Sequence, residues 1–374
     1  MNPLTWEQVH SFRMQQHQLL DPTDPEHIFH VVKRIGGIHA QLMSSAELAI
    51  NARVIDYLPA DLEQALWRDR SLIKTWAMRG TLHLLPSGEF PVYVAARQAF
   101  PINRPPSYFT YHGVTPDEFE AIQEGIPGTL NDQPMTREEL AEALAKSTGN
   151  PHLREVLLSG WGALLKPAAF RGEICFGPNQ GQNVTFVKPE RWIGEWQPLD
   201  PQEAIQEMAR RYLHAFGPAR PEDFARWWGF DAAKGKKVFR ALGEEIRSVD
   251  VEGWPAFTLV SSLETIQTSQ ETFAVRLLPQ FDAYVVGVSR DCEPVLPGAF
   301  KNLVYRPQGW ISAVLLVNGR MEGVWEMEKQ GSKTVVNVRT FQPINRKVEQ
   351  GIQKELERLG KYWDSEVSAT YALI

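Results

Sequence analysis

Short helical segments followed by pairs of short strands recur along this chain, and glycine and proline punctuate the boundaries between them. A doubly wound sheet would instead alternate strands with crossover helices and carry a glycine-rich phosphate loop, and the chain has neither. Helices followed by a strand hairpin are typical of a winged helix, which is a variant of the helix-turn-helix. The recurrence predicts an α+β fold with three tandem winged-helix (helix-turn-helix) units and a β-rich C-terminal segment.

The first predicted unit spans residues 1–100. Thr5 is a suitable N-cap for one helix, because its hydroxyl can accept a backbone N–H of the first turn. Residues 24–26 (Asp-Pro-Glu) open a second helix, since proline suits the first turn and acidic side chains favour the positive end of the helix dipole. Residues 61–68 form a third predicted helix, and residues 74–85 form one strand.

The second predicted unit spans residues 130–195. Residues 136–139 (Thr-Arg-Glu-Glu) have the spacing of a capping box, which starts a helix. Apolar residues at helical spacing predict another helix over 153–165. Residues 171–177 and 183–187 flank a turn rich in glycine, proline and amide side chains, so they predict the hairpin that would form the wing.

The third predicted unit, residues 200–262, has the clearest helix-turn-helix pattern, because tight turns separate its amphipathic helices. We expect three helices and then two strands, at 201–215, 221–228, 231–242, 246–251 and 256–260. Lys234, Lys236 and Lys237 open or lie within the helix that would contact DNA, where they would neutralise phosphates. Arg220, Arg226 and Arg240 of the same unit could neutralise phosphates in the same way. A solvated helix face explains this cluster equally well.

The last segment, residues 263–374, is predicted to be mostly strands with one covering helix. Strands are expected at 275–278, 283–288, 311–317, 321–328 and 334–341, and the helix at 345–359. Asn318-Gly319 is a strong two-residue hairpin signal, because both residues tolerate positive φ. Asp282 lies between aromatic residues at the opening of the second strand. A structural hydrogen-bond acceptor is the preferred interpretation, and a carboxylate facing the site is the alternative.

His39 and Gln41 are the first pair of candidate catalytic side chains. Alternate residues share a side in an extended or irregular segment, and Gly36-Gly37 favours irregular backbone just before them. A glutamine carbonyl and a neutral imidazole nitrogen both accept hydrogen bonds from a water. Without further context, two ordinary polar residues of a helix are the more common interpretation of such a pair.

Arg79 and His83 form a second candidate pair, for contact with DNA. If residues 74–85 are one strand, alternation puts Arg79, Thr81 and His83 on one face, and arginine suits phosphate. The alternative, equally weighted, is that Arg79 pairs with a carboxylate while His83 satisfies a buried backbone group. Arg306, in the loop before the third strand of the last segment, is a further candidate for reaching a DNA groove.

Composition limits the class of protein. The net charge of −6 argues against nonspecific binding of nucleic acids, although a local basic face can still bind DNA. Only two cysteines occur, Cys175 and Cys292, far apart and without metal-ligand spacing, so we expect a cytoplasmic protein without structural zinc. No apolar run is long enough to span a bilayer, and the N-terminus lacks the pattern of a signal peptide.

Four segments together resemble the winged-helix DNA glycosylase family typified by AlkZ and YcaQ. They are residues 37–41, 75–83, 278–284 and 318–325. Members of that family are built from three tandem winged-helix units around a concave DNA-binding surface, in agreement with the units predicted above. Their catalytic motif is Gln-x-Gln or Gln-x-Asp. This chain has His39-Ala40-Gln41, so the resemblance implies that His39 and Gln41 are catalytic, with His39 replacing the first glutamine.

The resemblance implies a monofunctional DNA glycosylase that acts on alkylated purines or interstrand crosslinks in double-stranded DNA. A purine alkylated at N3 or N7 is cationic, so its glycosidic bond is already weakened. The enzyme then needs to orient a water and stabilise an oxocarbenium-like sugar. We expect simple hydrolysis by a monomer without metal or cofactor. A non-catalytic DNA-binding regulator is the runner-up, and a protein-interaction module built from winged helices is a third interpretation.

Overall fold

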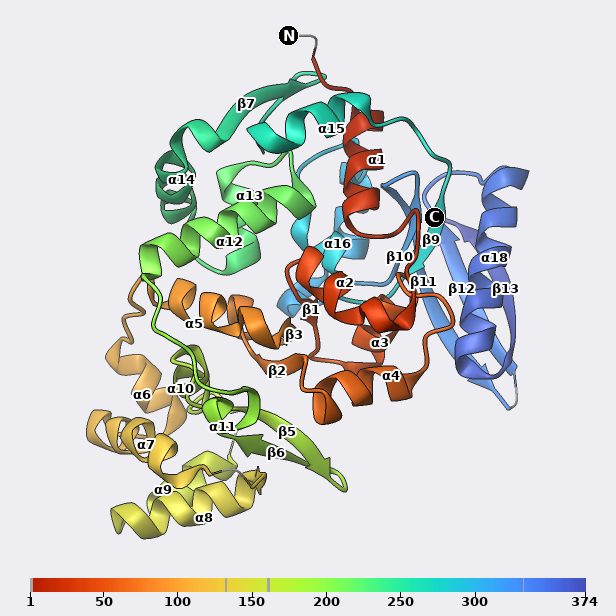
Figure 1. The fold of residues 1–374 in the computed structure, drawn as a ribbon. Helices are drawn as coiled ribbons and strands as arrows, with labels where there is room; N and C mark the ends of the chain where they lie inside the picture. Colours follow the sequence, from red (N-terminus) through yellow and green to blue (C-terminus); the bar gives the residue numbers. More distant parts are fainter. Residues whose placement is uncertain (1–2, 132, 160–161, 332) are drawn as a thin grey trace. The chain divides into compact units, whose positions relative to one another are not determined.

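The computed structural model describes residues 3–131, 133–159, 162–331 and 333–374 of the chain, which folds as a mixed α+β protein (Figure 1). The chain divides into two compact units. The outer unit consists of two stretches, Met1–Leu62 and Ala209–Ile374, and the inserted unit is Glu63–Met208. Helix α12 (Pro201–Phe216) contains the second boundary.

Helices of the outer unit come from both of its stretches. They are α1 (Trp6–Gln16), α2 (Ile28–Arg34), α3 (Met43–Asn51), α4 (Pro59–Glu63), α13 (Pro221–Trp228), α14 (Ala232–Ala241), α15 (Leu263–Thr268), α16 (Ala283–Gly287), α17 (Lys301–Val304) and α18 (Arg346–Trp363). Thr5 caps α1 in a capping box with Gln8, as its sequence predicts. The predicted helix at 24–26 begins as a 3-10 turn and continues as α2, and the one predicted at 61–68 is α4 followed by a π-type turn.

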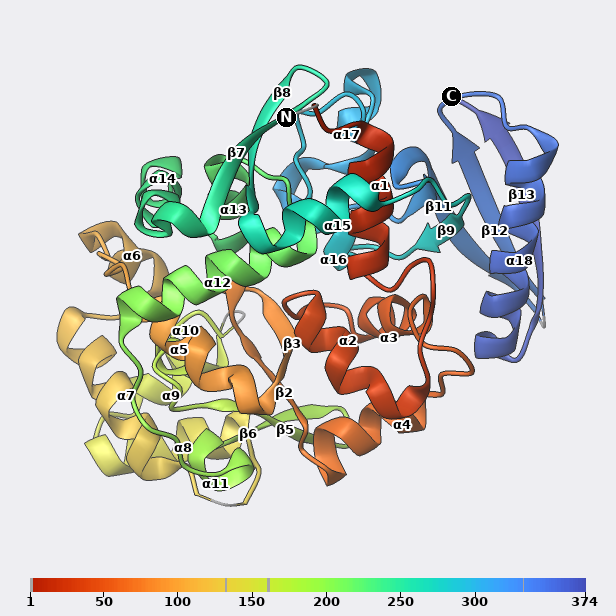
Figure 2. The same cartoon turned by 45° about the horizontal axis from the view of Figure 1, so that its top comes forward.

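A five-stranded sheet lies under α18 at the C-terminal end of the chain (Figures 1 and 2). Its order is β13 (Glu366–Leu373), β12 (Lys333–Thr340), β11 (Arg320–Gln330), β10 (Val314–Val317) and β9 (Val275–Leu278). Neighbours are antiparallel except β12 and β13. The hairpin predicted at Asn318-Gly319 is confirmed, with φ of 49° and 82° at the two turn residues. The edge strand β13 was not predicted.

Helix α18 packs on this sheet because its apolar residues recur at helical spacing. Val348, Ile352, Leu356 and Leu359 form one buried stripe that meets the buried side chains of the strands. Asn345 caps the helix by accepting a hydrogen bond from the Val348 N–H at 3.0 Å. Covering one face of the sheet in this way holds β9, and the loop that follows it, in place.

The predicted elements of residues 200–262 are confirmed as three helices and a hairpin. After α12, α13 and α14 come β7 (Ile246–Val251) and β8 (Trp254–Leu259), which pair antiparallel. Asp231 caps α14, accepting the Lys234 N–H at 3.0 Å. Ala219, between the first two helices, forms an antiparallel bridge with Phe257 of β8.

The inserted unit has a sheet of order β3-β2-β5-β6-β4 surrounded by helices. Its strands are β2 (Leu72–Trp76), β3 (Leu82–Pro86), β4 (Met135–Thr136), β5 (Cys175–Gln180) and β6 (Asn183–Val187). Its helices are α5 (Phe90–Gln98), α6 (Pro106–His112), α7 (Pro116–Thr129), α8 (Arg137–Thr148), α9 (His152–Leu158), α10 (Lys166–Phe170) and α11 (Pro189–Ile193). The predicted capping box of α8 and the predicted hairpin β5–β6 are confirmed, and β4 pairs antiparallel with β6.

Three predicted elements are wrong. Residues 74–85 are the two antiparallel strands β2 and β3, because the chain turns at Arg79 and Gly80, whose φ values are 57° and 67°. The helix predicted over 153–165 ends at Leu158, and two of its residues, 160–161, lie outside the described residues. Residues 283–288 are not a strand, because Asp282 caps the short helix α16. A short, wholly buried apolar run does not reveal its own period.

The described part of the chain contains neither a membrane-spanning helix nor a group of metal-binding side chains. It forms no helix long and apolar enough to cross a bilayer. Nor does this part contain a group of three or more histidine, cysteine, aspartate or glutamate side chains arranged to hold a metal ion. Both cysteines are free thiols, and both are buried.

Candidate active site

His39 and Gln41 follow an irregular stretch of backbone in the outer unit. Gly36 and Gly37 have φ of 73° and 98°, which other residues rarely adopt, so the glycines end α2 and turn the chain into β1 (Ile38–His39). The side chain of His39 is buried, with 7% exposed, whereas Gln41 is exposed. The buried Ala40 separates the two. An anchored imidazole therefore lies two residues from an accessible carboxamide.

Phe281 holds the ring of His39. The two ring centroids are 4.6 Å apart with an interplanar angle of 16°, and the edge of Trp310 meets Phe281 at 5.1 Å. Phe281 has φ of 58°, a left-handed conformation that is costly for a bulky residue. Such strain persists only where surrounding contacts enforce it, and it concentrates at functional sites.

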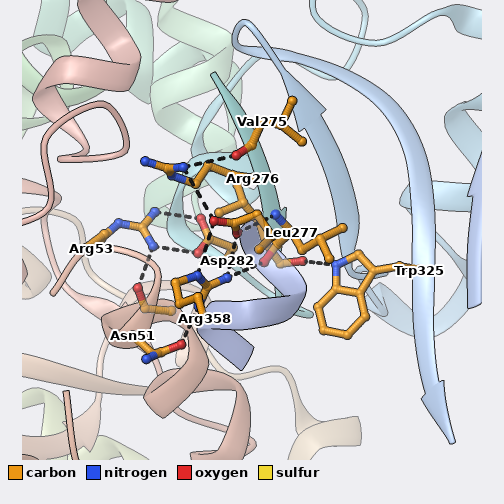
Figure 3. Close-up of polar contacts among 11 residues, drawn as sticks. Asn51, Arg53, Val275, Arg276, Leu277, Asp282, Trp325 and Arg358 are labelled. Atoms are coloured by element: carbon orange, nitrogen blue, oxygen red, sulfur yellow. Dashed lines mark hydrogen bonds and ion pairs between the residues drawn. The ribbon is translucent and has the colours of Figure 1, made fainter. Parts of the chain in front are cut away.

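The contact that enforces this conformation is the buried pair Arg53–Asp282. Two hydrogen bonds of 2.8 Å join the guanidinium to the two carboxylate oxygens, and both side chains are fully buried (Figure 3). Arg53 also donates to the Ala49 carbonyl at 2.7 Å, and Asp282 accepts the Tyr284 N–H at 2.9 Å. Asp282 is therefore a structural hydrogen-bond acceptor, as preferred from the sequence. Because the pair is bidentate, it fixes both the position and the orientation of Asp282, and so of Phe281 beside it in the chain.

A second set of polar contacts fixes the strand that leads into this loop. Glu355 of α18 accepts the Leu277 N–H at 2.9 Å and the Arg358 guanidinium at 2.6 Å. Arg358 also donates to Asn51, two residues before Arg53 in the chain (Figure 3). Trp325 of β11 donates its ring N–H to the Leu278 carbonyl at 2.9 Å. Helix α3, helix α18 and the central strands thus clamp both ends of the loop that carries Phe281.

Arg79 and His83 contact each other in the inserted unit, although not as neighbours on one strand face. Arg79 lies in the turn between β2 and β3, and its Nη2 is 3.4 Å from the Nε2 of His83. The Nδ1 of His83 is 2.9 Å from the Thr81 carbonyl, which can only accept, so Nδ1 carries the proton and Nε2 accepts. His83 thus bonds a backbone carbonyl, as the alternative interpretation expected, and also orients Arg79.

The basic residues of α14 are exposed on the side away from its buried face. Gly235, Val238 and Phe239 are buried, whereas Lys236 and Lys237 are exposed. Lys234 bonds Asp231 at 2.8 Å and lowers the pKa of that carboxyl, and Lys236 bonds Glu222 at 3.0 Å. Exposed pairs of this kind exchange readily with water and ions. The helix therefore presents cations that a polyanion could recruit.

Arg306 is exposed in a tight turn whose other end carries Trp310. Its backbone N–H donates to the Trp310 carbonyl at 2.8 Å, and Gln308 within the turn has φ of 60°. The turn thus connects a cationic side chain to the aromatic residue that supports Phe281. Sequence reasoning missed Phe281, Trp310 and Arg53, although aromatic residues on both sides of Asp282 were a usable signal.

Comparison with known proteins adds three matches. A family model described as DNA glycosylase AlkZ-like matches residues 32–362. A relative from Streptomyces sahachiroi, named interstrand DNA cross-link repair glycosylase, is 38% identical over 333 residues, which cover 87% of this chain and 89% of the relative. The solved structure of Streptomyces sahachiroi DNA glycosylase AlkZ matches with a TM-score of 0.89 and 34% identity, over 99% of this chain and all of that one.

Proposed function

We infer the reaction from one premise, which is that this chain belongs to the AlkZ-like family of DNA glycosylases. We propose that it hydrolyses the N-glycosidic bond of purines alkylated at N3 or N7 in double-stranded DNA, including those in interstrand cross-links, for whose repair its Streptomyces relative is named. We further propose that it does so as a monomer in the cytoplasm, and that it is monofunctional. His39 and Gln41 are the proposed catalytic residues.

The stacking of His39 on Phe281 is the observation that carries this proposal. A water attacks the sugar only if it is held in one place, and an imidazole fixed between a rigid aromatic ring and its own strand cannot swing away. His39 would accept from the water and take its proton, while the accessible Gln41 carboxamide would fix its second hydrogen. The cationic base leaves without being protonated, so no general acid is required.

The helix–hairpin groups of the chain support its proposed division into winged helices. In each of two groups a short extended segment precedes helices and then pairs with the second strand of a hairpin. In the first group β4 precedes α8, α9 and α10 and pairs with β6, and in the second Ala219 precedes α13 and α14 and pairs with Phe257. We propose winged-helix units at 1–100, 130–195 and 200–262, followed by the β-rich platform 263–374. Winged helices bind duplexes through a helix and a wing.

The proposed contacts with the DNA backbone come from three places in the chain. They are the turn with Arg79, which His83 orients, helix α14 with Lys234, Lys236 and Lys237, and the turn with Arg306. A chain of net charge −6 can bind DNA only through such local clusters. Steep salt dependence of duplex binding would distinguish this mode from a protein-interaction module.

Release of a damaged base is the direct test. A duplex with one N7-methylguanine is incubated with the protein, and abasic sites are counted by alkaline strand cleavage. We expect base release by the wild type, and a loss of about 100-fold or more in His39→Ala and in Gln41→Ala, the size of a lost general base. His39→Gln, which restores the glutamine of the family motif, should retain activity.

His27→Ala is the matched control, because His27 lies on the surface of the same unit, and it should behave as wild type. Unchanged release in both alanine variants would show that the catalytic residues lie elsewhere. No release by the wild type, together with salt-dependent duplex binding, would favour a DNA-binding protein without catalysis.

A further inference from the structure

A pocket of about 620 Å³ lies within the outer unit and has no role in the site described above. Two chain segments connect the pocket to that site. Ser44 and Ser45, in the first turn of α3, follow Gln41 by three and four residues, and Gln280 directly precedes Phe281. A group bound in the pocket would therefore contact the same two segments that carry the proposed catalytic residues.

The walls of the pocket are aromatic and apolar. Trp325 lines it from β11, and the hydrogen bond from its ring N–H to Leu278 fixes the indole (Figure 3). Trp363, the last residue of α18, lines another side and is half-buried. Met327 is 56% exposed, so the pocket opens to solvent there. Indole surfaces favour flat, aromatic ligands, which stack on them.

Polar groups in the pocket lack partners. Ser45 is buried, with 7% of its surface exposed. Within the described part of the chain, no residue forms a hydrogen bond with its hydroxyl. The amide of Gln280 is half-buried and likewise has no hydrogen bond to the residues that are described. The hydroxyl and the amide are not among the side-chain atoms that are buried without a partner, so solvent reaches them in the pocket, where they are available to the polar atoms of a ligand.

Charge excludes one class of ligand. Glu326 is the only charged residue among those that line the pocket, all of them in the described part of the chain, and no lysine or arginine is present there. A phosphate or carboxylate would lose its hydration without gaining a cation. A neutral or cationic planar group meets no such penalty.

We propose that this pocket binds the aromatic substituent of a bulky N7- or N3-purine adduct, and so sets which lesions the enzyme prefers. The inference rests on the proposed function, because it places the substituent next to the catalytic segments. The half-buried indole of Trp363 stacks on the substituent, the buried Trp325 closes the wall behind it, and Ser45 and Gln280 bond its polar atoms. Small adducts leave the pocket empty and gain nothing from it.

The test compares two lesions in one duplex sequence, N7-methylguanine and N7-benzylguanine. Trp363→Ala should lower kcat/KM for the benzyl lesion by roughly tenfold, the value of one aromatic stack, and change the methyl lesion by less than about twofold. Met327→Ala, at the exposed rim, cannot disturb the core and should lower the benzyl value by about threefold. Leu373→Ala is the matched control, because Leu373 is an exposed apolar residue of the same sheet outside the pocket.

Selective loss on the benzyl lesion in both pocket variants supports the pocket. Equal losses on the two lesions, or no loss on either, overturns it while leaving the proposed function intact. If the wild type releases neither base, the proposed function fails, and calorimetry with the free bases decides the pocket separately. There 7-benzylguanine should bind the wild type about tenfold more tightly than it binds Trp363→Ala, and equal affinity overturns the proposal.

Discussion

The helix–hairpin group of residues 116–187 and that of residues 201–259 have a similar order of elements, apart from the additional helix α10 in the first, but different surfaces. In the first, the half-buried Arg154 of α9 is paired with Glu138 and Glu142 of α8. In the second, α14 exposes Lys236 and Lys237 over a buried face. One topology thus carries a helix whose arginine bonds two glutamates and a helix with three lysines, two of which bond one carboxylate each. We expect the larger number of lysines on α14, rather than the fold, to suit the second group to DNA.

The two groups also differ in how closely their helices approach. A Cβ on Gly235 of α14 would collide with the Pro221 carbonyl of α13, which is backbone and cannot move aside. A Cβ on Gly125 of α7 would come within 2.6 Å of the Leu144 Cδ2 of α8, which is the end of a flexible side chain. At these two glycines, the contact between α13 and α14 is therefore less able to accept a side chain than the contact between α7 and α8.

The largest expected effect is on the free energy of unfolding when alanine replaces each of these two glycines. Gly235→Ala should lower the free energy of unfolding by about 2 kcal/mol or more, since overpacking outweighs the better helix propensity of alanine. Gly125→Ala should cost less than about 1 kcal/mol, because Leu144 can change rotamer. Urea unfolding followed by circular dichroism measures both. Equal losses would mean that the two helix contacts are alike.

The next largest expected effect is on the affinity for duplex DNA, and it tests the difference in charge between the two groups. Lys236→Gln with Lys237→Gln should weaken binding to an undamaged duplex by about tenfold and reduce the slope of log K against log salt by up to about two, one for each lost phosphate contact. Arg154→Gln with Lys146→Gln in the other group should change neither quantity. Fluorescence anisotropy across a sodium chloride series checks this, and equal changes in the two variants would remove the distinction between the groups.

The smallest expected effect is on the pH dependence of stability, through Glu118 of the first group. The Thr115 backbone N–H, His152 and Asn150 bond the Glu118 carboxylate at the start of α7 and lower its pKa from 4.5 to about 2. A carboxyl with a depressed folded pKa stabilises the protein above its unfolded pKa and loses that contribution as pH falls from 4.5 towards 2. In Glu118→Gln, the melting temperature should therefore fall less between about pH 5 and about pH 3, the range in which a glutamate titrates. If the melting temperature of the variant depended on pH as that of the wild type does, the stabilising role of the Glu118 carboxylate would be contradicted.

Local chemistry predicted the elements that it controls. Caps at Thr5 and Thr136 and the turn at Asn318-Gly319 begin or join elements through bonds within a few residues, and all three are confirmed. The turn at Arg79 was missed, because the alternating pattern continued through a residue with positive φ. Helix α16 was missed because its cap depends on Asp282, whose position is set by Arg53 far away in the sequence.

The site was predictable only in part for the same reason. His39 and Gln41 stand out as a pair of water-binding side chains next to two glycines, and the family resemblance that pointed to them is confirmed as a family assignment. Their catalytic roles stay a prediction. The partnership of His39 with Phe281 joins positions separated by most of the chain, and no local pattern encodes it.

The discontinuity of the outer unit has a consequence for how the protein is made. Arg53 and Asp282 are 229 residues apart, and the whole inserted unit is translated between them. A nascent chain that has emerged only through Met208 already contains His39, Gln41, Arg79 and His83, yet it lacks the ring on which the imidazole rests. A product that terminates at this point therefore carries the proposed catalytic residues without the aromatic ring that holds His39 in place.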